Sequence, residues 1–269
     1  MKQVVLFLIL LFGVTWSVGF WLAAQPGPTS LSGFLAAFLP QVWAPTVIAL
    51  TLVGLSHGAH GVRTEVVERL RYRRGSAPWL AVAAITPAIA TALAVAAARF
   101  AGEGAAFTPS DAVPLAIGMQ IITGAVGEEL GWRGFLLPRL RKHYGPVTAA
   151  WVMGSLWSLW HVPAWFTPWL PHPTFPLASS LVFIACFGVF MAFVFYRAGE
   201  SVIATIMAHL SLNIMTAMGG VRLSSFMFWT TLATIFSVVA VCASIAMSRS
   251  VRGMEAVDDG QTAPSRPLG

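Results

Sequence analysis

Eight long apolar runs constrain this chain more than any other feature of its sequence. Each holds roughly 20 residues, the length of helix that crosses a hydrocarbon core about 30 Å thick. Inside lipid, every backbone N–H and C=O needs a partner within the protein, so runs of this kind predict transmembrane helices. The runs lie at about residues 4–24, 36–56, 78–100, 112–136, 147–165, 176–196, 201–220 and 225–247.

The composition leaves little chain for a separate soluble domain. Of the 269 residues, 57% are hydrophobic and 10% are charged, whereas a soluble domain is about a quarter charged. We therefore predict an all-α, polytopic transmembrane helix bundle of about eight helices, which forms a single domain over residues 1–248. Residues 249–269 are polar and rich in Gly, Pro and Ser, which predicts a disordered tail.

The distribution of basic residues predicts the orientation of the bundle. When the runs alternate across the membrane, all of the 16 Lys and Arg residues except Arg99 and Arg222 fall on one side. By the positive-inside rule that side is cytoplasmic, so both termini are expected in the cytoplasm of a multi-pass cell-membrane protein. The net charge of +6 is then explained by topology, and no nucleic-acid partner is predicted.

The first run has a second interpretation. Lys2, an apolar core and small residues near Ala24 also fit a cleaved signal sequence. The apolar stretch is longer than the usual signal core of about 7 to 15 residues, which favours a retained helix. The orientation of the other runs is the same in both cases.

The fourth run carries charges at membrane depth. An ionisable residue at a helix centre costs about 2.5 to 3.5 kcal/mol, so it normally faces the bundle interior and serves a function. In "GEELGWRGF", Glu129 and Arg133 are one helical turn apart and can form an internal ion pair. Glu128 points about 100° away from Glu129 and has no partner in its own helix.

Two further runs carry polar groups. His161 lies in the fifth run, one turn after Trp157, and His209 and Asn213 share one face of the seventh. A lone histidine can also be a hydrogen-bonded core residue, and a His/Asn pair can join two helices. At about 1.5 Å per residue, Glu128 and His209 lie at similar depths, about 16 and 18 Å from the nearest basic residues. We therefore expect these side chains to meet.

The expected cluster contains the groups needed to hydrolyse an amide. A carboxylate such as Glu128 can take a proton from water, and a histidine such as His161 can orient that water. His209 and Asn213 can donate hydrogen bonds to an oxygen that becomes negative in the transition state.

The three motifs resemble those of the CPBP family, the CAAX protease and bacteriocin-processing (Abi) group, also called type II CAAX prenyl endopeptidases. The family pattern is EExxxR, FxxxH and HxxxN or HxxxD on successive membrane segments. "EELGWR" at 128–133 and "HLSLN" at 209–213 match the first and third motifs. The second is matched at His161, with Trp157 in place of Phe. The resemblance covers about residues 63–215.

The resemblance implies an intramembrane endopeptidase with a protease core at about 112–220 and a cavity open towards the cytoplasmic side. In that interpretation Glu128 with His161 activates the attacking water, and His209 with Asn213 stabilises the oxyanion. The remaining two residues, Glu129 and Arg133, organise the site.

The resemblance leaves the cofactor open, because the family has been described both as metalloproteases and as glutamate-dependent proteases. A set of Glu128, His161 and His209 could hold a divalent metal such as zinc. The implied partners are membrane lipids and a peptide or protein substrate, with a lipid-modified or membrane-anchored one among the candidates.

Two other functions compete with proteolysis. One is a bacteriocin-immunity or scaffold protein, which keeps the fold and acts by binding partners. The other is a proton-coupled transporter that uses Glu128 and the histidines as a relay. The chain shows no evident internal repeat, which argues against transporter folds built from repeats.

Overall fold

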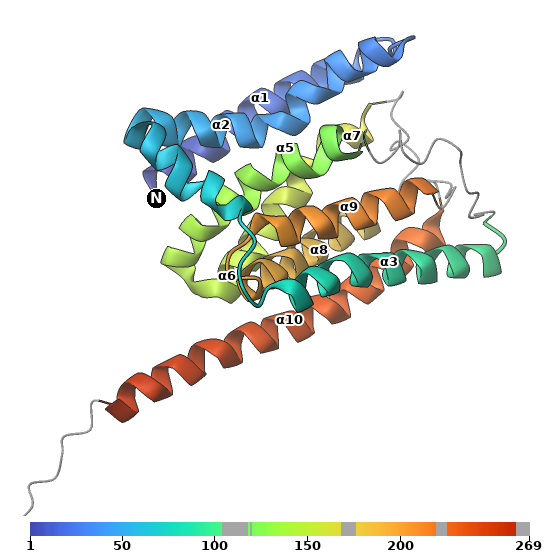
Figure 1. The fold of residues 1–269 in the computed structure, drawn as a ribbon. Coiled ribbons are helices and arrows are strands. Elements are labelled where there is room, and N and C mark those ends of the chain that lie inside the picture. The colour runs from blue at the N-terminus through green and yellow to red at the C-terminus, as the bar shows by residue number, and fades with distance from the viewer. Residues whose placement is uncertain (104–117, 119, 168–175, 219–224, 262–269) are drawn as a thin grey trace, which may run out of the picture.

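A computed structural model describes residues 1–103, 118, 120–167, 176–218 and 225–261, and this part of the chain is helical with short connections and no strand (Figure 1). The elements are α1 (Lys2–Ala23), α2 (Leu31–Glu65), η1 (Val67–Leu70), α3 (Ala77–Phe100), η2 (Ile121–Ala125), α5 (Val126–Glu129), η3 (Leu130–Leu136), α6 (Leu137–Trp160), α7 (Val162–Trp165), α8 (Leu177–Arg197), α9 (Val202–Met218) and α10 (Phe226–Gln261).

The prediction of an all-α multi-pass membrane bundle is confirmed. Within the described ranges, five helices are long and apolar enough to cross a membrane, and the apolar helix α9 is shorter. The predicted fourth run is only partly described, because 112–117 and 119 lie outside those ranges. The five helices are Lys2–Ala23, Ser32–Leu70, Ala77–Phe100, Leu177–Arg197 and Phe226–Ser250.

Three helices extend beyond the predicted runs. α2 continues to Glu65 through a kink at Gly58, and α6 includes the basic segment expected as a loop, up to a kink at Gly145. Both glycines have a φ near +70°, a conformation that glycine adopts without steric cost. α10 runs to Gln261, so most of the segment predicted as a disordered tail is helical, and 262–269 lie outside the described residues. No proline interrupts that segment before Pro264.

The segment η2–α5–η3 lies at the centre of the bundle. In Figure 1, α1 and α2 lie on one side of it, and α8, α9, α3 and α10 lie on the other. It packs against α2, α6 and α9, and all residues of η3 are buried. Side chains from this segment can therefore reach several other helices.

Two glycines allow the central segment to lie directly on α2. A Cβ atom on Gly127 would lie 2.9 Å from the carbonyl oxygen of Val42, and one on Gly131 would lie 2.3 Å from the carbonyl carbon of Pro45. A glycine pair spaced by four residues is a common contact between membrane helices, because it lets two backbones approach closely. The glycines face α2, and the intervening Glu128 and Glu129 are directed to other helices.

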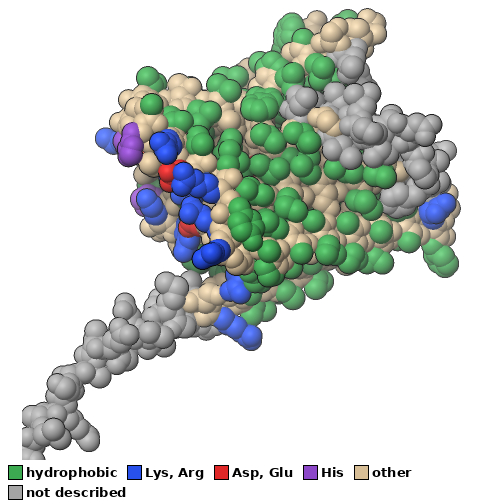
Figure 2. Space-filling view, viewed as in Figure 1, with side chains coloured by type: hydrophobic (Ala, Val, Ile, Leu, Met, Phe, Trp, Pro, Cys, Tyr) green, Lys and Arg blue, Asp and Glu red, His purple; other side chains and the backbone are tan. Residues whose placement is uncertain are grey.

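Ion pairs join several elements at one end of the bundle. Figure 2 shows most of the basic side chains gathered at the left end of the visible face, beside a largely apolar surface. There Arg139 pairs with Glu65 at 2.6 Å, and Glu200 pairs with both Arg141 and Arg69. Glu200 has a φ of +60°, which is unusual for a residue other than glycine. We call this end the basic end.

We predict that Gly131→Ala destabilises the bundle by about 1 to 3 kcal/mol, because its methyl group would overlap the backbone of Pro45 and cannot be relieved by a side-chain rotation. Gly134→Ala is the matched control, since its nearest neighbour would lie at an ordinary 3.6 Å. The stability of the control should be unchanged or higher, because alanine favours a helix more than glycine does. Thermal unfolding of both purified variants in detergent measures the difference, and equal stabilities would contradict the packing described.

Candidate active site

The two glutamates lie on one turn of α-helix between two π-helical turns. α5 carries Glu128 and Glu129, and it is flanked by η2 before it and η3 after it. A π-helical turn holds an extra residue, and such turns are frequent at functional sites. Glu128 is 4% exposed and Glu129 is fully buried.

Glu129 connects two helices through a buried network. Its Oε1 accepts a hydrogen bond from Arg133 Nη1 at 2.8 Å and one from His209 Nδ1 at 2.9 Å. Both Glu129 and Arg133 are completely shielded from solvent, and His209 is 5% exposed. The ion pair expected from the spacing is therefore present, and it also fixes His209 of α9. Since a carboxylate only accepts, His209 donates from Nδ1.

Trp157 of α6 contacts most of the other polar groups. Its Nε1–H donates to Glu128 Oε2 at 2.8 Å, and the Arg133 guanidinium lies 4.3 Å from its ring centroid. His161 and His209 pack edge-on against the indole, with ring centroids 5.2 and 5.4 Å away. The family pattern has Phe at this position, and a phenyl ring could not donate this hydrogen bond. The motif therefore did not indicate that the indole N–H contacts Glu128.

Glu128 and His161 line one small cavity of about 90 Å³. The remaining walls are mostly apolar and come from α1, α2 and the start of α7. A cavity of this size with a carboxylate and an imidazole in its wall has room for water. Its other lining residues are Gly19, Leu22, Phe38, Gln41, Val42, Trp160, Pro163, Ala164 and Thr167.

The cavity lies away from the basic end. Gly19 and Leu22 belong to the last turns of α1, whereas Lys2 lies at the start of that helix. A cavity open towards the basic, cytoplasmic side was expected, and the described cavity does not support that opening. The number of residues between Glu128 and the nearest basic side chain was used to predict how deep Glu128 lies in the membrane. That depth does not determine at which end of the bundle a cavity lies.

The orientation of His161 is set by its own helix. His161 Nδ1 lies 2.8 Å from the carbonyl oxygen of Trp157. A carbonyl oxygen only accepts, so Nδ1 carries the proton and the lone pair of the neutral ring is on Nε2. A ring held in this way can accept a proton through Nε2.

His209 and Asn213 face the backbone of Gly124 in η2. A Cβ atom on Gly124 would lie 3.2 Å from Asn213 Nδ2 and 4.0 Å from His209 Nε2. Two side-chain nitrogens from consecutive turns of α9 therefore point to one place beside the central segment. The missing side chain of Gly124 leaves room there, and nothing in the sequence motif indicated this glycine.

The structure brings the six predicted site residues together around the central segment and Trp157. It does not gather metal ligands. Within the described part of the chain, which includes Glu128, His161 and His209, no three His, Cys, Asp or Glu side chains form a group suited to a metal ion. The placement of these side chains therefore does not fit a metal, and we derive no step through one.

Comparisons with known proteins agree with the resemblance seen in the motifs. Residues 109–215 match the family model described as "Type II CAAX prenyl endopeptidase Rce1-like". This region contains all six site residues. A curated relative, "CAAX prenyl protease 2" from Methanococcus maripaludis, is 27% identical over 173 residues. That alignment covers 60% of this chain, and the chain spans 62% of the length of the relative.

We predict that Arg133→Ala destabilises the protein by about 3 to 5 kcal/mol, because it leaves the Glu129 carboxylate buried without its cation. Arg141→Ala is the control: it also removes an arginine from an ion pair, but that side chain is 42% exposed and its loss should cost no more than about 1 kcal/mol. Unfolding of both variants by heat or denaturing detergent compares them. Similar losses of stability in the two variants would show that the buried ion pair contributes no more than the exposed one.

Proposed function

We propose that the chain is an intramembrane endopeptidase of the CPBP family, the CAAX protease group of multi-pass membrane proteins, which its match over residues 109–215 and its 27% identical relative support. The observation that carries the proposal is the arrangement of two pairs of groups around the central segment and Trp157. Glu128 and His161 line a single cavity, and His209 and Asn213 converge beside Gly124. Acid–base groups and hydrogen-bond donors are the two components that hydrolysis of a peptide bond needs.

In the proposed reaction, a water in the cavity is held between Glu128 and His161. One of the two takes a proton as the water oxygen attacks the scissile carbonyl carbon, which forms a tetrahedral intermediate. The proton then passes to the leaving nitrogen as the C–N bond breaks. The products are a carboxylic acid and an amine, and the two side chains return to their starting forms.

His209 and Asn213 are proposed to stabilise the oxyanion. Both side chains direct a nitrogen towards the space beside Gly124. A carbonyl oxygen placed there could accept from Asn213 Nδ2, and from His209 Nε2 when both ring nitrogens are protonated, since Nδ1–H already donates to Glu129. Donors held before the reaction begins need no reorganisation when negative charge develops. Glu129 supports this arrangement, since it holds His209 through Nδ1.

Trp157 is proposed as a positioning residue for the reacting carboxylate. Its N–H holds one oxygen of Glu128, and its carbonyl oxygen holds the ring of His161. The same residue thus orients both groups that contact the water. A fixed geometry of this kind contributes to the rate because the reactants need not search for it.

The substrate proposed is a peptide near a membrane anchor. The relative named as a prenyl protease suggests a prenylated C-terminal peptide as the first substrate to test. Apolar lining by Leu22, Phe38 and Val42 suits aliphatic side chains next to the cleaved bond. The cavity lies near the end of α1 that is far from Lys2, so this cavity does not provide access for a peptide from the basic end.

We predict that Glu128→Gln lowers peptide cleavage by at least roughly 100-fold, because an amide cannot take the proton of water. The protein in lipid nanodiscs is incubated with a farnesylated peptide that ends in Cys followed by two aliphatic residues and one further residue. Mass spectrometry measures the released C-terminal fragment. An unprenylated peptide of the same sequence tests whether the lipid is recognised.

Glu68→Gln is the matched control, because it removes a carboxylate that forms only long ion pairs at the basic end. Unchanged cleavage by Glu128→Gln would refute the proposed role. If no test peptide is cleaved, membrane proteins from cells with the wild type and with Glu128→Gln can be compared for missing cleavage products. The absence of any difference there would refute proteolysis itself.

A second prediction concerns the hydrogen bond to Glu128. Trp157→Phe should lower kcat by about 10- to 100-fold with little change in KM, since it removes a hydrogen bond to a charged group and keeps an aromatic ring. Trp151→Phe is the control on the same helix, where the indole donates to Ser244 instead. A rise in KM with constant kcat would show that Trp157 binds substrate and does not position Glu128.

A further inference from the structure

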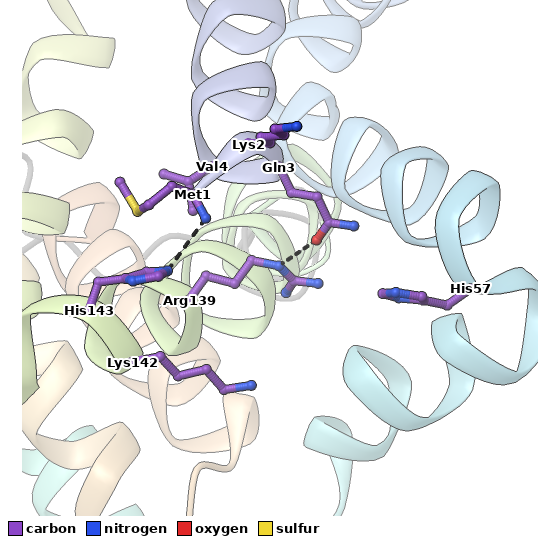
Figure 3. A pocket seen from close by; sticks show the side chains of 8 residues that line it. All are labelled: Met1, Lys2, Gln3, Val4, His57, Arg139, Lys142 and His143. Carbon is purple, nitrogen blue, oxygen red and sulfur yellow. Dashed lines mark hydrogen bonds between the residues drawn. The ribbon is translucent and has the colours of Figure 1, made fainter.

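A second cavity, of about 390 Å³, lies at the basic end and is separate from the candidate active site (Figure 3). The start of α1 forms one wall, and the two cavities therefore lie at opposite ends of that helix. Figure 3 shows His57 reaching in from α2, opposite the side chains of α6. The lining residues are Met1, Lys2, Gln3, Val4, His57, Arg139, Lys142 and His143.

Arg139 forms a fixed part of this cavity. Its guanidinium donates to Glu65 at 2.6 Å, to Gln3 at 3.1 Å and to the carbonyl oxygen of Phe135 at 3.1 Å. It also lies 3.8 Å from the centroid of the Phe135 ring. Burial lowers the pKa of Arg139, and the neighbouring Glu65 opposes that effect. The charge of Arg139 is therefore held in place, with three of its five N–H groups already used.

The two lysines supply positive charge that the protein does not neutralise. Within the described residues, neither Lys2 nor Lys142 forms an ion pair, and both are exposed. The nearest carboxylate, Glu65, is already engaged by Arg139 and by His57 at 2.7 Å. Three permanent cations, Lys2, Arg139 and Lys142, therefore line the cavity, and no carboxylate is among its lining residues.

The first turn of α1 adds to the positive potential. It contains no acidic residue, and no side chain caps it by a hydrogen bond. The N-terminus of a helix carries a partial positive charge and N–H groups that lack partners within the helix. Gln3 and Val4 of this turn line the cavity, so those groups lie beside it. Such an arrangement suits an anion with several acceptor oxygens.

We propose that this cavity binds a phosphate group, as carried by the headgroup of an acidic phospholipid. Lys2 and Lys142 would contact the phosphate oxygens, with Arg139 behind them. The location supports this ligand, because the basic end is the side that the positive-inside rule places at the anionic cytoplasmic leaflet. The proposal goes beyond proteolysis and does not depend on it.

The test uses the full chain in nanodiscs that contain phosphatidylcholine with a small fraction of phosphatidylglycerol. Native mass spectrometry after release from the nanodiscs counts the lipids that remain bound, and inorganic phosphate and glycerol phosphate are added as soluble competitors. Lys142→Gln is compared with Arg74→Gln, which removes an exposed cation from the same end of the bundle but outside the cavity. Thermal unfolding verifies that both variants are folded.

We expect one retained phosphatidylglycerol per protein, with an affinity that falls roughly fivefold in Lys142→Gln and stays unchanged in Arg74→Gln. Lys142→Arg should retain the binding. Displacement by inorganic phosphate at low concentration would support a phosphate site and identify a free anion as its ligand. Equal losses in Lys142→Gln and Arg74→Gln, or equal retention of phosphatidylcholine, would overturn the proposal.

Discussion

The buried ion pair of Glu129 and Arg133 is the interaction on which the rest of the site depends. Both side chains are fully enclosed in a bundle that lies in lipid, where neither charge is tolerated without the other. The pair in turn fixes His209 through the carboxylate and Trp157 through the face of its ring. Trp157 then holds Glu128 through its N–H. The ion pair is not proposed to contact the reacting atoms, but it orients His209 and Glu128, which are proposed to do so.

Much of this arrangement could be predicted from the sequence, because helical spacing is a local property. The i, i+4 relation of Glu129 and Arg133 requires only one turn of helix, and the similar depths of Glu128 and His209 follow from the rise per residue. The apolar runs agree with the described helices for the same reason. In lipid, an apolar run cannot form an irregular segment or an open sheet edge, as it could in a soluble protein, so its helical structure can be predicted.

Other features depend on contacts between distant segments and leave no local signal. The hydrogen bond from Trp157 to Glu128 needs the rotation of α6 relative to the central segment, and the space beside Gly124 needs the position of α9. Hydropathy marks where the chain is apolar, but it does not show that Gly58 bends α2 or that the basic part of α6 is helical. The position of the cavity depends likewise on how the ends of α1 and α2 pack.

The ion pairs at the basic end have a mechanical consequence. Glu65 and Glu200, with their arginine partners, tie α1, α2, η1, α6 and the α8–α9 turn together at one end of the described bundle. Towards its other end, α1 is held by a hydrogen bond that Trp160 donates to Thr15 at 3.0 Å. Both side chains of that bond are buried, whereas the ion pairs at the basic end are partly exposed. Dissolved salt screens exposed charges and hardly affects buried groups, so ionic strength acts on the two ends of α1 unequally.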